Sequence, residues 1–187
     1  QVSVAAVNDA PQIGDAPVVD PLQVGAAGQA NGGSFQPRFS PDGTTVAFLS
    51  SAGNLVPGDT NARTDVFLTD LATGSVTRVS TAADGAQAAL GAQADQYFPL
   101  TFSPDGTKLL FWSETAFVPG DTNTVRDLYA KDLVTGQISL VNSDSSGNVG
   151  NRPLSSDDDF ITRAAFLPDG TKILFISPAS NLVDNDT

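Results

Sequence analysis

Two closely similar acidic loops carry the residues of this sequence that are best suited to chemistry. Each loop reads Gly-Asp-Thr-Asn, from residue 58 and again from residue 120, and a second aspartate follows four residues after the asparagine. Such a loop offers oxygen ligands at its positions 1, 3 and 7, and Ca²⁺ prefers oxygen ligands, which backbone carbonyls and water can complete. A third, partial copy covers residues 181–187. The predicted Ca²⁺ ligands are Asp59, Asn61, Asp65, Asp121, Asn123, Asp127 and Asp186.

The same loops also have a purely structural interpretation. Asp59 and Asp121 can form Asx turns, while Asp65 and Asp127 can cap the starts of strands. The loops are not EF-hands, because the central glycine and terminal glutamate of that motif are missing. A structural turn repeats as faithfully as a metal site, so both interpretations stay open.

The composition excludes several classes of function. The chain has 187 residues, no cysteine, no histidine and a formal net charge of −12. Thiol and imidazole catalysis and the usual zinc and iron sites are therefore excluded, and the negative charge disfavours nucleic acids and anionic membranes as partners. No apolar run approaches the ~20 residues of a spanning helix, and no carboxylate spacing suggests a glycosidase pair. We expect no enzyme, no nucleic-acid partner and no membrane span.

An internal repeat organises the chain. The segment FSPDGTTVAF at 39–48 returns as FSPDGTKLLF at 102–111 and as FLPDGTKILF at 166–175. A second pair, DVFLTDLATG at 65–74 and DLYAKDLVTG at 127–136, occurs in the same order. Several markers in one order at one period identify a repeat protein.

Each repeat predicts four short antiparallel strands. In the first repeat an apolar segment ends at Phe39, and strands 45–50, 65–70 and 75–80 follow, separated by turns at SPDG and TG and by the acidic loop. In the second repeat the first strand is expected at 97–102. A four-stranded antiparallel sheet repeated in tandem is the blade of a β-propeller, so the predicted fold is all-β.

These motifs resemble the WD-repeat-like blades of TolB-type β-propellers over residues 34–187. The opening VSVAAVNDAP at 2–11 resembles a junction found in large bacterial surface adhesins. The expected organisation is an N-terminal strand or linker segment at 1–33 and a partial propeller at 34–187. The partial propeller divides into a blade at 34–80, a linker at 81–96, a blade at 97–142, a linker at 143–160 and a half-blade at 161–187. Propellers need about four to eight blades, so the expectation is a segment of a longer polypeptide or a unit that other copies complete.

Other candidate residues have mainly structural interpretations. The aspartates of the two hairpin turns are expected to form those turns; they are Asp42, Asp70, Asp105, Asp132 and Asp169. The acidic run 157–159 reads as a solvated face, or alternatively as a contact for a cation or a partner. Trp112 is expected to pack between blades, with a carbohydrate-stacking surface as the alternative.

The function expected is that of a non-catalytic propeller segment, stabilised by Ca²⁺ and acting in adhesion or self-assembly. Its expected location is secreted or on the bacterial cell surface, with the periplasm as the alternative. The partners expected are a protein or further copies of the chain, which would add their amino-terminal strands to the half-blade. A surface glycan is the alternative partner. Two alternatives remain: a periplasmic TolB-type protein-binding scaffold, and a propeller that binds or acts on carbohydrate.

Overall fold

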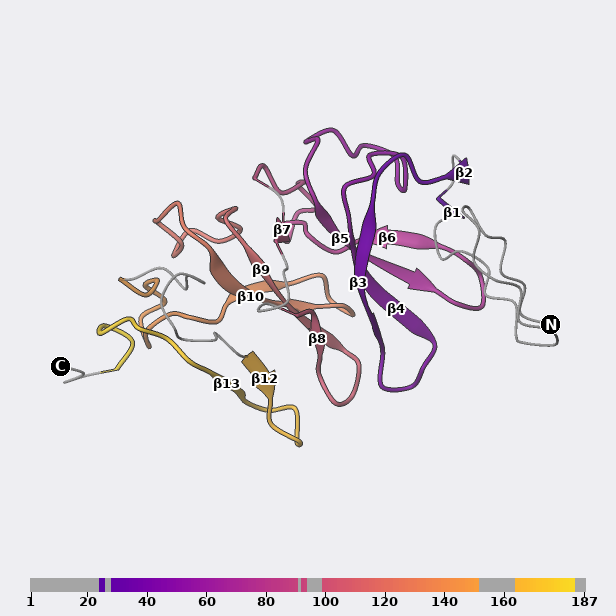
Figure 1. The fold of residues 1–187 in the computed structure, drawn as a ribbon. Helices are drawn as coiled ribbons and strands as arrows, with labels where there is room; N and C mark the ends of the chain where they lie inside the picture. The colour runs from indigo at the N-terminus through magenta and orange to yellow at the C-terminus, as the bar shows by residue number, and fades with distance from the viewer. Residues whose placement is uncertain (1–23, 26–27, 91, 94–98, 152–163, 184–187) are drawn as a thin grey trace.

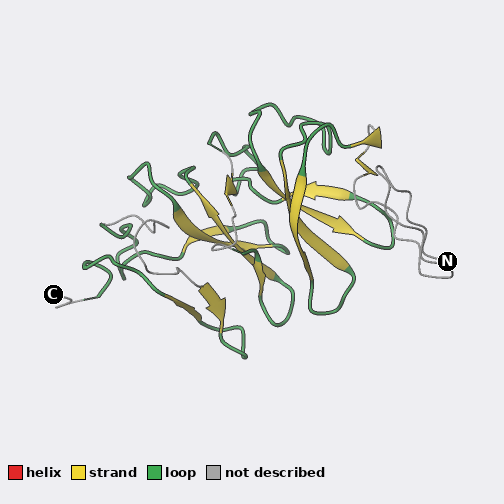
Figure 2. Cartoon of the chain, viewed as in Figure 1, coloured by secondary structure: helices red, strands yellow, loops and turns green. Residues whose placement is uncertain are grey.

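The computed structural model describes residues 24–25, 28–90, 92–93, 99–151 and 164–183. Within these residues all regular elements are β-strands joined by turns and loops (Figure 2). The described part contains no helix of the length and apolarity needed to cross a membrane. The all-β prediction is therefore confirmed.

The first blade is a four-stranded antiparallel sheet in sequence order, as predicted. Its strands are β3 (Ser34–Phe39), β4 (Thr45–Ser50), β5 (Asp65–Asp70) and β6 (Val76–Arg78). β4 and β5 pair without interruption from Thr45 opposite Asp70 to Ser50 opposite Asp65. This register brings the end of β4 and the start of β5 together at the base of the first acidic loop, 51–64.

The second blade repeats this order but divides its first strand in two. Its strands are β7 (Ala92–Gln93), β8 (Thr101–Phe102), β9 (Lys108–Ser113), β10 (Asp127–Asp132) and β11 (Ile138–Leu140). Both β7 and β8 pair with β9. β3 has a bulge between Phe35 and Arg38 at the corresponding place in the first blade.

Two shorter hairpins flank the complete blades. β12 (Ala164–Phe166) and β13 (Ile173–Phe175) form the start of a third sheet, and β1 (Val24–Gly25) and β2 (Gly28–Gln29) pair ahead of the first blade. Two full sheets and one half-sheet of this kind form a partial propeller, as predicted.

The sheets lie side by side in chain order and pack face to face (Figure 1). One core lies between the first and second sheets; it includes Ala47, Leu49, Val66, Leu109, Phe111 and Tyr129. A second core, built on Leu110, Trp112 and Leu128, faces β12 and β13. Alternation along each central strand therefore sends successive side chains to opposite neighbours. Trp112 is buried in the second core, which agrees with the packing prediction.

The SPDG turns show why the repeat is so regular. In the first turn Ser40 Oγ donates to Asp42 Oδ1 over 2.6 Å, and Asp42 Oδ1 accepts from the Thr44 amide. Gly43 has a φ of 72°, a conformation that only glycine adopts without strain. Ser103 and Asp105 repeat these bonds in the second blade. The prediction that these aspartates form turns is confirmed.

Candidate functional site: two buried acidic loops

The first acidic loop brings its three predicted side chains to one place. The Asn61 amide donates to Asp65 Oδ2 over 2.8 Å and to the carbonyl oxygen of Ala88. The Asp65 charge helps to raise the pKa of Asp59, although burial is the larger cause. Asp59 and Asp65 are therefore close enough for their charges to interact, as a shared site requires.

Residues outside the loop hold this group from two sides. Ser80 Oγ donates to Asp65 Oδ1 over 2.5 Å, and it also accepts from the amide of Val66. Gln87 Nε2 donates to Asp59 Oδ1 over 2.7 Å, and Arg78 Nη1 lies 3.6 Å from the same oxygen. The loop thus contacts the end of β6 and the segment that follows β6 towards the second blade.

The second acidic loop has the same aspartate and asparagine positions, but its aspartates have different hydrogen-bond partners. Asn142 Nδ2 donates to Asp127 Oδ1 over 2.5 Å, and Asn142 Oδ1 accepts from the amide of Leu128. The Tyr129 hydroxyl donates to Asp121 Oδ2. Asn142 therefore does here what Ser80 does in the first blade, while a phenol replaces the arginine as partner of the first aspartate.

The electrostatics of the second loop are dominated by burial. Burial raises the pKa of Asp127 to about 6, and the Asp121 charge contributes in the same direction, while the amides of Asn142 and Asn123 oppose it. Burial and the hydrogen bond to Asp121 also raise the pKa of the Tyr129 hydroxyl. A carboxyl in such a place is costly to ionise unless a cation or further donors compensate it.

The hydrogen bonds support the structural role of both loops and leave their metal role a prediction. In the described part of the chain, no three Asp, Glu, His or Cys side chains gather into a metal-binding group. Each loop instead combines two carboxylates with one asparagine, which is the donor set the sequence predicted. Asp186 and the acidic run 157–159 lie outside the described residues.

Sequence reasoning missed the partners that complete the loops. Ser80, Asn142, Arg78 and Gln87 lie 15 to 28 residues from the aspartates they contact. The repeat itself, with SVTRVS at 75–80 matching QISLVN at 137–142, places Ser80 and Asn142 at one shared position, but it does not show that they contact the aspartates. No sequence signal identifies Arg78 as the partner of Asp59.

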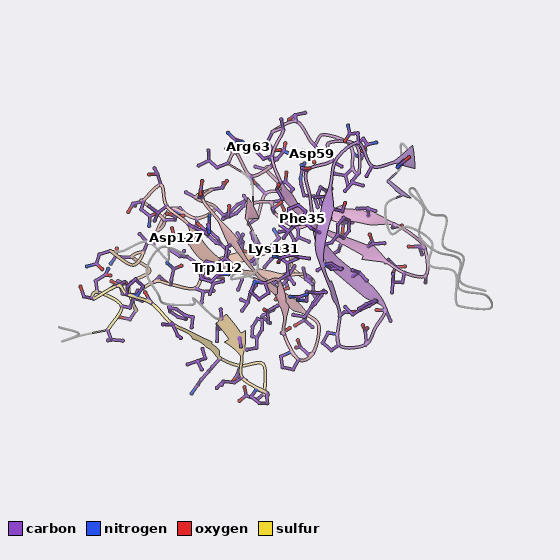
Figure 3. All side chains as sticks on the ribbon, in the orientation of Figure 1. Phe35, Asp59, Arg63, Trp112, Asp127 and Lys131 are labelled. Atoms are coloured by element: carbon purple, nitrogen blue, oxygen red, sulfur yellow. The ribbon has the colours of Figure 1, made fainter. Side chains whose placement is uncertain are left out.

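A buried lysine forms a second polar centre between the complete blades. Lys131 Nζ, on β10, donates to the carbonyl oxygen of Thr81 over 2.7 Å, to the hydroxyl of Thr81 and to the carbonyl oxygen of Ala82. Burial lowers the pKa of this amine. The lysine therefore fastens the second blade to the chain leaving the first (Figure 3).

Among known proteins, the chain is similar to several solved structures. No family model and no curated protein matches the chain. Among solved structures the chain is similar to TolB from Acinetobacter baumannii, with a TM-score of 0.40 and 19% identity over 82% of this chain and 40% of that one. It is also similar to the β-propeller domain of the Trilobed protease from Pyrococcus furiosus, with a TM-score of 0.43 and 16% identity over 78% of this chain and 34% of that one.

A third similar structure is an oligogalacturonate lyase in complex with manganese, with a TM-score of 0.43 and 16% identity over 82% of this chain and 33% of that one. The chain thus spans 40% or less of the length of these structures. The assignment of blades itself rests on the strand order and the repeat of this chain.

Proposed function

We propose that the chain is a non-catalytic propeller segment that works by docking, and that the free face of β12 and β13 receives a blade from a second copy. The observation that carries this proposal is a difference between equivalent residues. Leu110 is 1% exposed in the core between the second and third sheets, whereas Leu174, its counterpart in the repeat, is 67% exposed. Trp112 and its counterpart Ile176 differ in the same way.

The free face continues an interface that the molecule already uses. On β13 the alternate residues Ile173 and Phe175 pack against the second sheet, so Leu174 and Ile176 point to the side where a further blade would lie. Apolar side chains at these positions are buried in both complete blades. A blade of the same repeat therefore fits this face better than an unrelated surface does.

The edge of β13 supports the same proposal. β4 and β9 each pair with strands on both sides, but β13 pairs only with β12 among the described residues. An edge strand with unpaired backbone groups accepts another strand. The apolar segments 2–7 and 17–24 of a second copy are the strands that the sequence offers for this edge. Copies joined in this way would close into a ring or extend as a filament.

We also propose that Ca²⁺ stabilises the segment and that it acts outside the cytoplasm, in adhesion or assembly at the bacterial surface, with the periplasm as the second location. Two oxygen-rich loops with buried carboxylates support the ion, and loop sites of extracellular modules bind Ca²⁺ at about 10⁻⁴–10⁻³ M. A bound ion stabilises the fold by about 2.7 kcal/mol when its concentration is a hundred times Kd. Thermal melting in about 10 mM CaCl₂, a hundred times a Kd of about 10⁻⁴ M, should then lie several degrees above melting in chelator. Equal melting temperatures would refute the calcium part of the proposal.

Sedimentation velocity over a range of concentrations tests the docking. The full chain should associate as its concentration rises, and Leu174→Asp should keep it monomeric, because a charge cannot be buried in an apolar contact without cost. Val134→Asp is the matched control, since Val134 is 77% exposed in a turn outside the proposed interface. A full chain that stays monomeric at all concentrations would overturn the proposal.

A further inference from the structure

The two acidic loops compensate their buried charge in different ways. In the first loop Arg78 approaches Asp59 and also donates to the carbonyl oxygen of Gly58. β6 places Arg78 opposite Phe67, and β11 places Leu140 opposite Tyr129, so Leu140 occupies the position of Arg78 in the second blade. The outer strand thus supplies a cation to the first loop, where the second blade has an apolar side chain at the same position. The arginine within the second loop, Arg126, lies with its Nη2 3.9 Å from Glu114 Oε1.

The second loop has a carboxylate oxygen that the protein leaves without a partner. Asp127 is completely buried, and its Oδ2 has no hydrogen bond, although Oδ1 is bonded to Asn142. The Asn123 amide is close enough to lower the pKa of this carboxyl, yet its Nδ2 is also buried without a hydrogen bond. Asp121, which is 7% exposed, bonds Tyr129 through Oδ2 and the amide of Asn123 through Oδ1. Both carboxylates of the second loop are therefore buried, and Asp127 Oδ2 remains without a hydrogen bond to compensate its charge.

The first loop also has a buried carboxylate oxygen without a hydrogen bond, but cationic and amide donors lie next to it. Asp59 Oδ2 is also buried without a hydrogen-bond donor. The other oxygen of that carboxylate, however, faces both Arg78 and Gln87. At position 149, where a bridge to Ser143 matches the bridge of Gln87 to Thr81, the second blade has a valine. Neither donor of the first loop is therefore reproduced in the second.

We propose that the second loop binds one Ca²⁺ ion through Asp121, Asn123 and Asp127, and that Arg78 takes the place of the ion in the first loop. The inference rests on the calcium part of the proposed function and assigns the ion to one loop. Carboxylate and amide oxygens are hard donors, and a loop of flexible coordination number suits Ca²⁺ better than Mg²⁺. The guanidinium of Arg78 thus compensates the aspartate charge of the first loop, and the Ca²⁺ ion compensates that of the second.

Substitutions that move the arginine from position 78 to the equivalent position 140 test the inference. Isothermal titration of the metal-free full chain with CaCl₂ should give one ion per chain. Asp127→Asn should weaken binding more than about tenfold, since even partners of metal ligands contribute that much. Leu140→Arg should abolish binding, because it supplies the cation of the first loop. Arg78→Leu should raise the stoichiometry to two ions.

The outcomes distinguish a failure of the assignment to the second loop from a failure of calcium binding as such. No binding by the unaltered chain would overturn both. One ion per chain that survives both Asp127→Asn and Leu140→Arg would leave calcium binding intact and refute its assignment to the second loop. A stoichiometry that stays at one in Arg78→Leu would refute the role of the arginine. Asp105→Asn, in a turn away from both loops, is the control, and far-UV circular dichroism checks that each variant folds.

Discussion

Leu110→Ala and Leu174→Ala remove the same atoms from equivalent positions and should have very different effects. Leu110 packs between the second and third sheets against Trp112 and Leu128. Replacing a buried leucine by alanine costs 2–5 kcal/mol, which includes the cavity left behind. Because Leu110 is almost completely buried, we expect about 3 kcal/mol for Leu110→Ala, in the middle of this range. Leu174→Ala should change the free energy of unfolding by about 0.5 kcal/mol or less.

Urea unfolding followed by tryptophan fluorescence measures both variants. The chain contains one tryptophan, Trp112, and it lies in the same core as Leu110. The fluorescence therefore reports the packing of the second sheet against the third. The measurement should be made at low protein concentration, where Leu174 is not in contact with a second copy. Equal losses in the two variants would refute the assignment of a covered and a free face.

Three further predictions concern the loops, the blade junction and the turns. Gly120→Ala should destabilise the fold, because a β-carbon there would collide with the backbone oxygen of Gly147; a lowered melting temperature checks this, and an unchanged one would contradict it. Lys131→Met should lower the free energy of unfolding by about 1.5–3 kcal/mol in urea, the range for hydrogen bonds of charged groups. An unchanged free energy of unfolding would contradict the role of Lys131 between the blades. Hydrogen bonds from Ser103 and Thr107 lower the pKa of Asp105 to about 2, so its contribution to stability is present above pH 3.8 and is lost as the pH falls through 2. Asp105→Asn should therefore weaken this acid dependence, and an identical pH profile would contradict the argument.

The sequence predicted the parts of the fold that depend on neighbouring residues. The SPDG turn follows from a proline, an Asx side chain and a glycine with positive φ within four residues. Strands 45–50 and 65–70 were predicted with the bounds that β4 and β5 have. Of the predicted strand 97–102, only Thr101 and Phe102 form β8, and residues 97–98 lie outside the described part.

The candidate site was predictable only in part, for a physical reason. The aspartates and asparagines of the loops stand out because they repeat, whereas their partners come from later strands and differ between blades. Arg78 and Leu140 share a position on the outer strand but belong to opposite chemical classes. Lys131 likewise has Thr69 as its counterpart in the first blade. Because these long-range contacts differ between the blades, the repeat in the sequence does not predict them.

Hydrogen exchange at β13 tests the proposed docking most directly. The amides of Ile173 and Phe175 point to the outer edge of β13, which has no partner among the described residues, because Leu167 N–H donates to the carbonyl oxygen of Lys172 and successive amides of an antiparallel strand point to opposite edges. If a second copy adds a strand there, exchange of these amides should slow as the protein concentration rises, while exchange at β4 stays unchanged. Exchange at β13 that is equally fast at every concentration would contradict docking through this edge.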